Sequence, residues 1–239
     1  MVSDDGGYLS VNVIAHRGAS AAEQENTVQA FRRATAMGAD AVELDVRRTS
    51  DGVLVVHHDA HVPAGAIVQL RIGELPAHVP TLAAALDACD GMWVNVEIKN
   101  DEREPDFDPT DSIADETIAH LLSRDEDERW LISSFRLATI DRCRELAPHI
   151  RTAWLTVAVP PDAVATLVER GHAALHPWVN LLDRPTVDAC HAAGIEVNTW
   201  TCDDPVRIAE LAAWGVDGVC TNVPDVAVTV RAQGVDAPG

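Results

Sequence analysis

Carboxylate side chains stand near the ends of two short apolar segments. Glu43 and Asp45 lie in Ala41–Val46, and Glu97 lies in Trp93–Ile98. Because residues two apart on a strand share a face, Glu43 and Asp45 must point the same way. Carboxylates on one face of an apolar strand need a compensating cation, and their oxygens suit Mg²⁺ or Ca²⁺. We therefore predict that all three bind a divalent metal; the alternative is salt bridges to neighbouring strands.

Two histidines are candidates for acid–base catalysis. His16 directly follows the predicted strand Val11–Ala15. His58 follows an Asp51-Gly52 turn and an apolar run, which together predict a hairpin after the second strand. An isolated histidine at a strand end is more often structural than catalytic. A pair of imidazoles, however, can serve as base and acid because their pKa values lie near working pH.

Two cations stand beside these groups. Arg17 adjoins His16, and Lys99 lies two positions after Glu97, on the same face of the strand. Arginine can hold an anion with two donors at once, whereas a structural Glu97–Lys99 ion pair is the alternative for the lysine. A divalent cation held by the carboxylates would act as a Lewis acid on a phosphate oxygen. Together with the two histidines and the two cations, it favours phosphodiester cleavage as the reaction.

The candidate residues fall at the ends of strands in a repeated strand–helix pattern, which is typical of parallel βαβ units. About eight units in 239 residues predict a (β/α)8 TIM barrel with its active site at the C-terminal ends of the strands. A doubly wound open sheet is the alternative. The predicted strands are Val11–Ala15, Ala41–Val46, Trp93–Ile98, Trp130–Ser133, Arg151–Val157, Ala173–His176, Ile195–Trp200 and Gly218–Thr221; the predicted helices include Thr27–Met37, Thr81–Ala88, Ile113–Leu122 and Pro205–Trp214.

The sequence contains no break in composition, so we predict a single domain over residues 1–239. Two stretches are irregular. Asp59–His78 is predicted to be a short insertion after the second strand. The acidic stretch Asn100–Asp111 is predicted to be a solvated loop.

Composition narrows the possible partners and location. The formal net charge is −20, which repels nucleic acid and anionic membrane surfaces. The sequence has no run of about 18 apolar residues, so we predict no membrane span. Met1–Ser10 lacks the apolar core of a signal peptide. The five cysteines are widely spaced without a CxxC pattern, as is typical of reduced thiols. We therefore predict a cytoplasmic protein.

Several motifs together resemble the glycerophosphodiester phosphodiesterase family, and the resemblance covers nearly the whole chain. The motifs that carry it are IAHRGAS at 14–20, GADAVELDV at 38–46, DGVLVVHHD at 51–59, VEIK at 96–99 and GVDGVCTNVP at 215–224. After His58-Asp59 this sequence departs from the family, because it lacks an Arg-Thr-rich stretch and its insertion is short.

The resemblance implies a TIM barrel that hydrolyses glycerophosphodiesters to an alcohol and glycerol 3-phosphate with Ca²⁺ or Mg²⁺. It also implies a role for each candidate residue. The metal ligands would be Glu43, Asp45 and Glu97, the acid–base pair His16 and His58, the phosphate contacts Arg17 and Lys99, and the aromatic contact to substrate Trp200.

Alternative functions use the same residues. A lysophospholipase D-like enzyme on the same barrel would differ in its substrate, and a non-catalytic barrel would bind a metal or phosphate without turnover. A glycosidase using two carboxylates would leave the histidines and cations without roles. The sequence does not decide the alcohol head group of the substrate, the choice between Ca²⁺ and Mg²⁺, or the oligomeric state. It also does not decide which histidine is the acid, or whether the nucleophile is water or an internal hydroxyl of the substrate.

Overall fold

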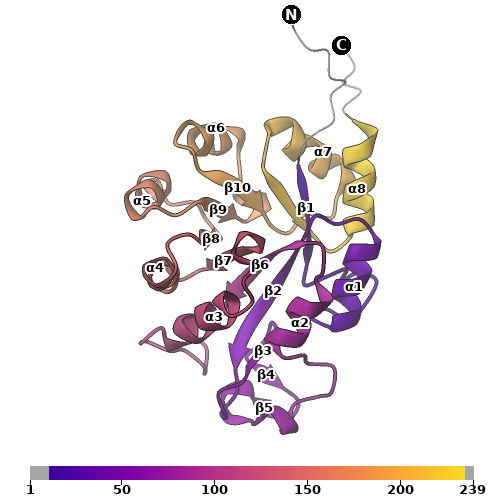
Figure 1. Ribbon diagram of the computed structural model, residues 1–239. Helices are drawn as coiled ribbons and strands as arrows, with labels where there is room; N and C mark the ends of the chain where they lie inside the picture. The colour runs from indigo at the N-terminus through magenta and orange to yellow at the C-terminus, as the bar shows by residue number, and fades with distance from the viewer. Residues whose placement is uncertain (1–10, 235–239) are drawn as a thin grey trace, which may run out of the picture.

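The computed structural model describes residues 11–234, and eight parallel strands form its centre (Figure 1). β1 pairs in parallel with both β2 and β11, which closes the sheet into a barrel and excludes the doubly wound alternative. Residues 1–10 and 235–239, at the ends of the predicted domain, lie outside the described residues. The barrel strands are β1 (Asn12–His16), β2 (Ala41–Arg48), β6 (Trp93–Ile98), β7 (Trp130–Ser134), β8 (Arg151–Thr156), β9 (Ala174–Pro177), β10 (Glu196–Thr199) and β11 (Gly218–Thr221).

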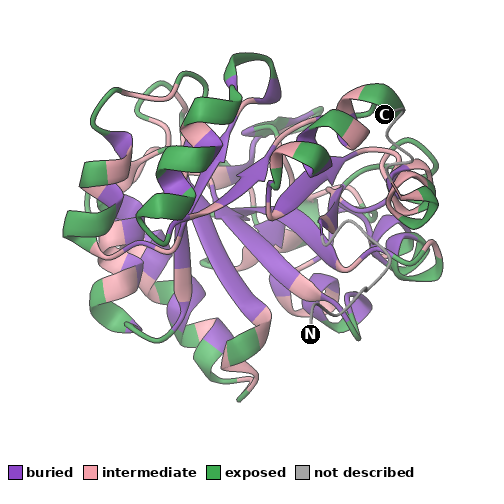
Figure 2. Ribbon diagram, turned by 90° about the horizontal axis from the view of Figure 1, so that it is seen from above, coloured by how far each residue is buried: buried purple, intermediate pink, exposed green. Residues whose placement is uncertain are grey.

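All eight predicted strands are confirmed, with ends that differ by no more than two residues. Helices cover the outside of the barrel, where buried strands lie behind largely exposed helix faces (Figure 2). The helices are α1 (Val28–Ala36), α2 (Leu82–Ala88), α3 (Ser112–Leu122), α4 (Leu137–Leu146), α5 (Ala163–Arg170), α6 (Arg184–Ala192), α7 (Pro205–Trp214) and α8 (Pro224–Gln233).

Helix ends follow the local sequence. The Thr27 hydroxyl accepts a hydrogen bond from the backbone of Ala30 at the start of α1, and Thr81 does the same for α2. Gly171 and Gly215 end α5 and α7 in the left-handed conformation that glycine adopts without strain. These caps fix where α1 and α2 begin and where α5 and α7 end.

The two faces of each strand serve different purposes. On β2, Val42, Leu44 and Val46 belong to the large core between the barrel and its helices. The opposite face points into the barrel, where small apolar clusters fill the interior below the charged residues. The alternation of apolar and polar residues along β2 is therefore an alternation between the helix layer and the barrel interior.

The segment after β2 forms the predicted hairpin and the short insertion. β3 (Leu54–Val56) runs antiparallel to β2, with Val56 opposite Val46. A small hairpin of β4 (His61–Val62) and β5 (Gly65–Ala66) and two short 3-10 turns at Ile67–Gln69 and Ile72–Glu74 follow. The hairpin therefore returns His57 and His58 to the end of the barrel where β2 finishes.

None of the helices within residues 11–234 combines the length and apolar character that crossing a bilayer requires.

Candidate active site

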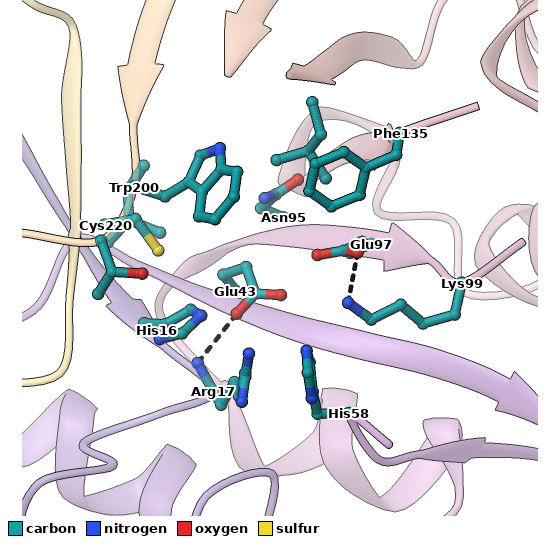
Figure 3. A pocket seen from close by; sticks show the side chains of 13 residues that line it. His16, Arg17, Glu43, His58, Asn95, Glu97, Lys99, Phe135, Trp200 and Cys220 are labelled. Atoms are coloured by element: carbon teal, nitrogen blue, oxygen red, sulfur yellow. Dashed lines mark hydrogen bonds and ion pairs between the residues drawn. The ribbon is translucent and has the colours of Figure 1, made fainter. Parts of the chain in front are cut away.

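A pocket of about 260 Å³ opens at the C-terminal ends of the barrel strands (Figure 3). One side is charged and the other is largely apolar, so the pocket can hold an anion beside a carbon skeleton. Its lining consists of Ile14, His16, Arg17, Glu43, His58, Asn95, Glu97, Lys99, Phe135, Leu155, Trp200, Thr201 and Cys220.

Three carboxylates meet at the charged side. Oxygen atoms of Glu43, Asp45 and Glu97 lie within 4.8 Å of one another, and all three residues are buried. The register of the barrel causes this meeting, because Asp45 stands directly opposite Glu97 on neighbouring strands. The Oε1 atom of Glu43 is buried and has no hydrogen-bond partner among residues 11–234. A buried carboxylate oxygen without a donor is what a site for a hard cation requires.

Two cations offset part of this negative charge. Lys99 Nζ lies 2.8 Å from Asp45 Oδ1 and 2.5 Å from Glu97 Oε1. Arg17 Nε lies 3.2 Å from Asp45 Oδ2, and the Arg17 backbone N–H donates to Glu43 Oε2 at 3.0 Å. The cations therefore contact Asp45 from two sides, whereas the side chain of Glu43 receives no cationic partner within the described chain.

The carboxyl groups respond differently to this environment. Burial raises the pKa of Glu43 well above its usual range, and repulsion from Asp45 and Glu97 adds to the rise. Burial also acts to raise the pKa of Asp45, but Lys99 and Arg17 outweigh it and hold that pKa below its usual range. Of the three carboxyl groups, Glu43 is thus the one whose negative charge is least balanced by positively charged side chains.

The two histidines line the same pocket with different partners. His16 Nδ1 lies 2.8 Å from the side-chain oxygen of Asn222, a neutral amide. Burial, followed by the charge of Arg17, lowers the pKa of His16. His58 Nδ1 lies 2.8 Å from the Asp59 carboxylate. One imidazole is therefore paired with an amide and the other with a carboxylate.

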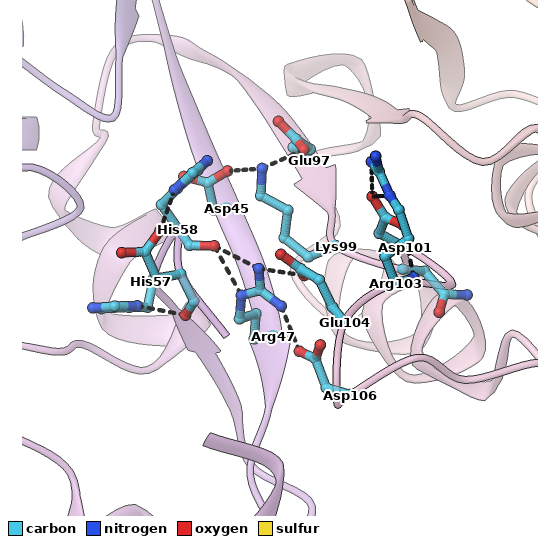
Figure 4. Close-up of polar contacts among 12 residues, drawn as sticks. Asp45, Arg47, His57, His58, Glu97, Lys99, Asp101, Arg103, Glu104 and Asp106 are labelled. Atoms are coloured by element: carbon cyan, nitrogen blue, oxygen red, sulfur yellow. Dashed lines mark hydrogen bonds and ion pairs between the residues drawn. The ribbon is translucent and has the colours of Figure 1, made fainter. Parts of the chain in front are cut away.

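His57, the neighbour of His58 in the hairpin, points away from the site (Figure 4). Its Nδ1 lies 2.8 Å from the backbone oxygen of Asp59, and it is absent from the residues lining this pocket. The adjacent histidines of the hairpin thus have separate environments (Figure 4).

Trp200 and Phe135 form the aromatic part of the apolar side. Their rings meet edge to face, with centroids 5.5 Å apart. The Trp200 indole N–H donates to the backbone oxygen of His176 at 2.8 Å, which fixes the ring at the end of β10. Phe135, which follows β7, is 42% exposed.

Arg47 on β2 is a buried residue outside the candidates that the sequence motifs indicate. It lies two positions after Asp45 and is 1% exposed. Its guanidinium donates twice to the backbone oxygen of His58, at 2.9 and 2.6 Å, and to Asp106 at 2.6 Å (Figure 4). The strand alternation that places Glu43 and Asp45 on one face extends to Arg47 and was the available signal.

The acidic stretch Asn100–Asp111 is held in place, so the prediction of a solvated loop was partly wrong. Asn100 and Asp111 are buried and hydrogen-bonded to each other at 2.8 Å. Between them, Asp106 and Asp108 form ion pairs with Arg47 and Arg48 of β2. The acidic residues compensate the arginines at the end of β2, a relation that composition cannot reveal.

Other polar residues complete the surroundings of the site. Asn26 donates from Nδ2 to Asp45 Oδ2 at 2.7 Å, and Asn95 lines the pocket on β6. Asn95 stands two positions before Glu97, so strand alternation could have identified it. Asn222 contacts His16, and Asp203 contacts Asn222; strand alternation does not identify either residue.

The fold and the pocket together define a β/α-barrel enzyme with an acidic, cation-lined centre at its catalytic face. Comparison with known proteins gives the particular family. The model of the "Glycerophosphoryl diester phosphodiesterase family" matches in two overlapping segments, residues 16–76 and 64–226. The chain therefore belongs to this family and is a phosphodiesterase, as the resemblance predicted.

Similar proteins match over almost their whole length. A glycerophosphodiester phosphodiesterase of Bacillus altitudinis is 30% identical, with 92% of this chain and 98% of the relative covered. One of Caldanaerobacter subterraneus subsp. tengcongensis is 29% identical over 93% of this chain and 98% of the relative. A solved phosphodiesterase of Oleispira antarctica, in complex with the product sn-glycerol-3-phosphate, is 26% identical with a TM-score of 0.82, covering 92% of this chain and 96% of that one.

Proposed function

We propose that this phosphodiesterase hydrolyses glycerophosphodiesters to an alcohol and sn-glycerol 3-phosphate in a metal-dependent reaction with two histidines. The observation that carries the proposal is that two carboxylates, two cations and two histidines line one pocket, and that Asp45 lies directly behind the two carboxylates. The similar Oleispira antarctica phosphodiesterase binds sn-glycerol-3-phosphate, which is the product expected of this reaction.

Glu43, Asp45 and Glu97 are the proposed metal ligands. Their oxygens lie close enough together for one ion, and the unpartnered Oε1 of Glu43 supports the fit. A bound Ca²⁺ or Mg²⁺ would supply Lewis-acid polarisation of a non-bridging phosphate oxygen. Both ions prefer oxygen ligands, so titrations of the protein with Ca²⁺ and with Mg²⁺ measure which ion binds more tightly.

Arg17 and Lys99 are the proposed phosphate contacts. Both line the pocket beside the carboxylates. Their charges lie where a phosphodiester must enter a protein of net charge −20, so they offset the overall repulsion locally. The guanidinium of Arg17 can donate two parallel hydrogen bonds to phosphate, and Lys99 acts as a point charge.

His16 is proposed to accept the proton of the nucleophile, which is water or a neighbouring hydroxyl of the substrate, and His58 to protonate the departing alkoxide. Burial, followed by the charge of Arg17, lowers the pKa of His16, which favours the neutral ring that a base requires, while His58 Nδ1 lies 2.8 Å from the Asp59 carboxylate. Trp200 and Phe135 are proposed to pack against the carbon atoms of the substrate, since they form the apolar side of the same pocket.

The decisive measurement is release of sn-glycerol 3-phosphate from glycerophosphocholine and glycerophosphoethanolamine. Assays with Ca²⁺, Mg²⁺ or chelator would be run on the wild type, Glu43→Gln, His16→Ala and the control His57→Ala. The proposal expects metal-dependent release that is lost in the first two variants and kept in the control. A folded wild type that releases no glycerol phosphate with any metal would overturn it, and release of lysophosphatidic acid from lysophosphatidylcholine would then favour the lysophospholipase D-like alternative.

A further inference from the structure

Asn222 lies directly after β11 and connects the last strand of the barrel to the first. Its side-chain Oδ1 is 2.8 Å from His16 Nδ1 on β1, and the Ser20 hydroxyl lies 2.9 Å from the same oxygen. β1 and β11 are neighbouring strands, with Ala15 opposite Thr221. The contact between Asn222 and His16 therefore depends on closure of the barrel.

Asp203, in the segment between β10 and α7, fixes which way the Asn222 amide faces. Its carboxylate accepts from Asn222 Nδ2 at 2.7 Å, from the Asn222 backbone N–H at 2.7 Å, and from the Thr221 hydroxyl at 2.9 Å. A carboxylate offers only acceptors, so the NH₂ group of Asn222 must face Asp203. The amide oxygen of Asn222 must then face His16.

An amide oxygen can only accept, so the hydrogen between the two side chains belongs to His16 Nδ1. The reversed amide would place its oxygen 2.7 Å from an Asp203 oxygen, a repulsive contact between two acceptors. A neutral imidazole carries one ring hydrogen, so Nε2 of His16 is left with a free lone pair.

We propose that Asn222 and Asp203 are positioning residues that hold His16 as the tautomer with hydrogen on Nδ1 and a free lone pair on Nε2. This inference rests on the proposed role of His16 as general base, because a base needs a lone pair to accept a proton. Neither residue needs to touch the substrate: Asn222 acts through His16, and Asp203 acts through Asn222. The arrangement resembles in purpose the carboxylate that selects the tautomer of a catalytic histidine in hydrolases.

The test combines kinetics with a direct reading of the His16 ring. Asn222→Ala removes the acceptor and should lower kcat for glycerophosphocholine by about 10- to 100-fold with little change in KM, within the contribution typical of a positioned acid–base group. Asn222→Asp alone places two carboxylates together and should also be impaired. The double exchange Asp203→Asn with Asn222→Asp keeps an acceptor at position 222 that faces His16. The amide NH₂ at position 203 can then donate to that acceptor, so kcat should recover.

Nitrogen-15 NMR of histidine-labelled protein gives a readout that needs no turnover. His16 is assigned by comparison with His16→Ala, and the wild type should show a protonated Nδ1 and a bare Nε2. Asn222→Ala should shift both resonances towards a tautomer mixture, and the exchanged pair should return them. The control is Asp204→Asn, which removes one negative charge at the neighbouring N-cap of α7, where an asparagine side chain can still cap the helix. This control should change neither kcat nor the His16 resonances.

The outcomes separate this inference from the proposed function. An unchanged His16 tautomer in folded Asn222→Ala, or kcat within twofold of wild type, would overturn the positioning role. A wild type with the expected tautomer but without hydrolysis of any glycerophosphodiester would instead overturn the proposed function, and with it the general base that this network is inferred to serve. Folding of each variant is checked by its thermal transition.

Discussion

Lys99 and Asp45 are in direct contact, with Nζ of the lysine 2.8 Å from Oδ1 of the aspartate. The same ammonium group contacts Glu97. Lys99 is therefore the group that shields the proposed metal ligands while being the proposed partner of the phosphate. A divalent cation binding to these carboxylates must coexist with that charge.

Lys99→Met should separate these two effects. Removing a positive charge beside the carboxylates should tighten Ca²⁺ binding by about tenfold or more, or about 1.4 kcal/mol. Removing a phosphate contact should raise KM for glycerophosphocholine. Calorimetric Ca²⁺ titration and initial rates measure the two, and weaker Ca²⁺ binding in the variant would contradict the proposed geometry.

Glu43→Gln should make the metal-free protein more stable and its response to metal smaller. Three carboxyl groups crowd together there, and Glu43 has the least compensation. The amide keeps an acceptor for the Arg17 backbone N–H while removing charge, so a gain of about 1 kcal/mol is expected. Thermal melts with chelator and with Ca²⁺ measure both effects. The exposed control Glu23→Gln removes the same charge elsewhere and should change neither.

The two histidine variants should differ in their dependence on the leaving group. His58→Ala should lose about 10²- to 10⁴-fold in rate on glycerophosphocholine but much less on a glycerol phosphodiester of nitrophenol, since nitrophenolate leaves without protonation. His16→Ala should lose activity on both substrates. Equal losses for both variants on both substrates would refute the assignment of base and acid, and the reverse pattern would exchange the two roles.

Arg47→Met should destabilise the fold strongly. The change leaves the nearly buried Asp106 carboxylate unpaired and removes both hydrogen bonds to the His58 backbone. Breaking such a buried pair typically costs about 3–5 kcal/mol, and kcat should also fall because His58 loses its anchor. Arg48→Met is the matched control, because its ion pairs are more exposed and should contribute about 1 kcal/mol or less. Urea unfolding of both variants checks the difference.

His176 should make the protein sensitive to acid. Burial, followed by the charge of Arg151, lowers its pKa from 6.5 to about 3, and its ring accepts from Asn198 at 3.1 Å. Between those values the unfolded chain binds a proton that the folded chain does not, so stability is lost as pH falls through this window. From pH 7 to pH 5 the loss from this residue is on the order of 2 kcal/mol. Urea unfolding at both pH values should show a smaller pH effect in His176→Gln, and an equal effect would contradict the prediction.

The positions of the barrel strands and many of the site residues followed from the sequence because strand alternation is a local property. Glu43, Asp45 and Arg47 share a face whatever the rest of the chain does, and the same rule places Asn95 beside Glu97. Repeated strand–helix units likewise predicted the barrel. The location of the active-site residues at strand ends then followed from the parallel arrangement.

The tertiary structure alone decided which of these faces meet. Closure of the barrel brings His16 to Asn222, 206 positions away, and the loop after β6 folds back so that Asp106 reaches Arg47, 59 positions away. Such contacts depend on register and closure across the whole sheet rather than on local periodicity. The sequence by itself therefore determined which residues are candidates for the chemistry, whereas the orientation of His16, the burial of Arg47 and the unequal compensation of the three carboxylates were set only when distant strands packed together.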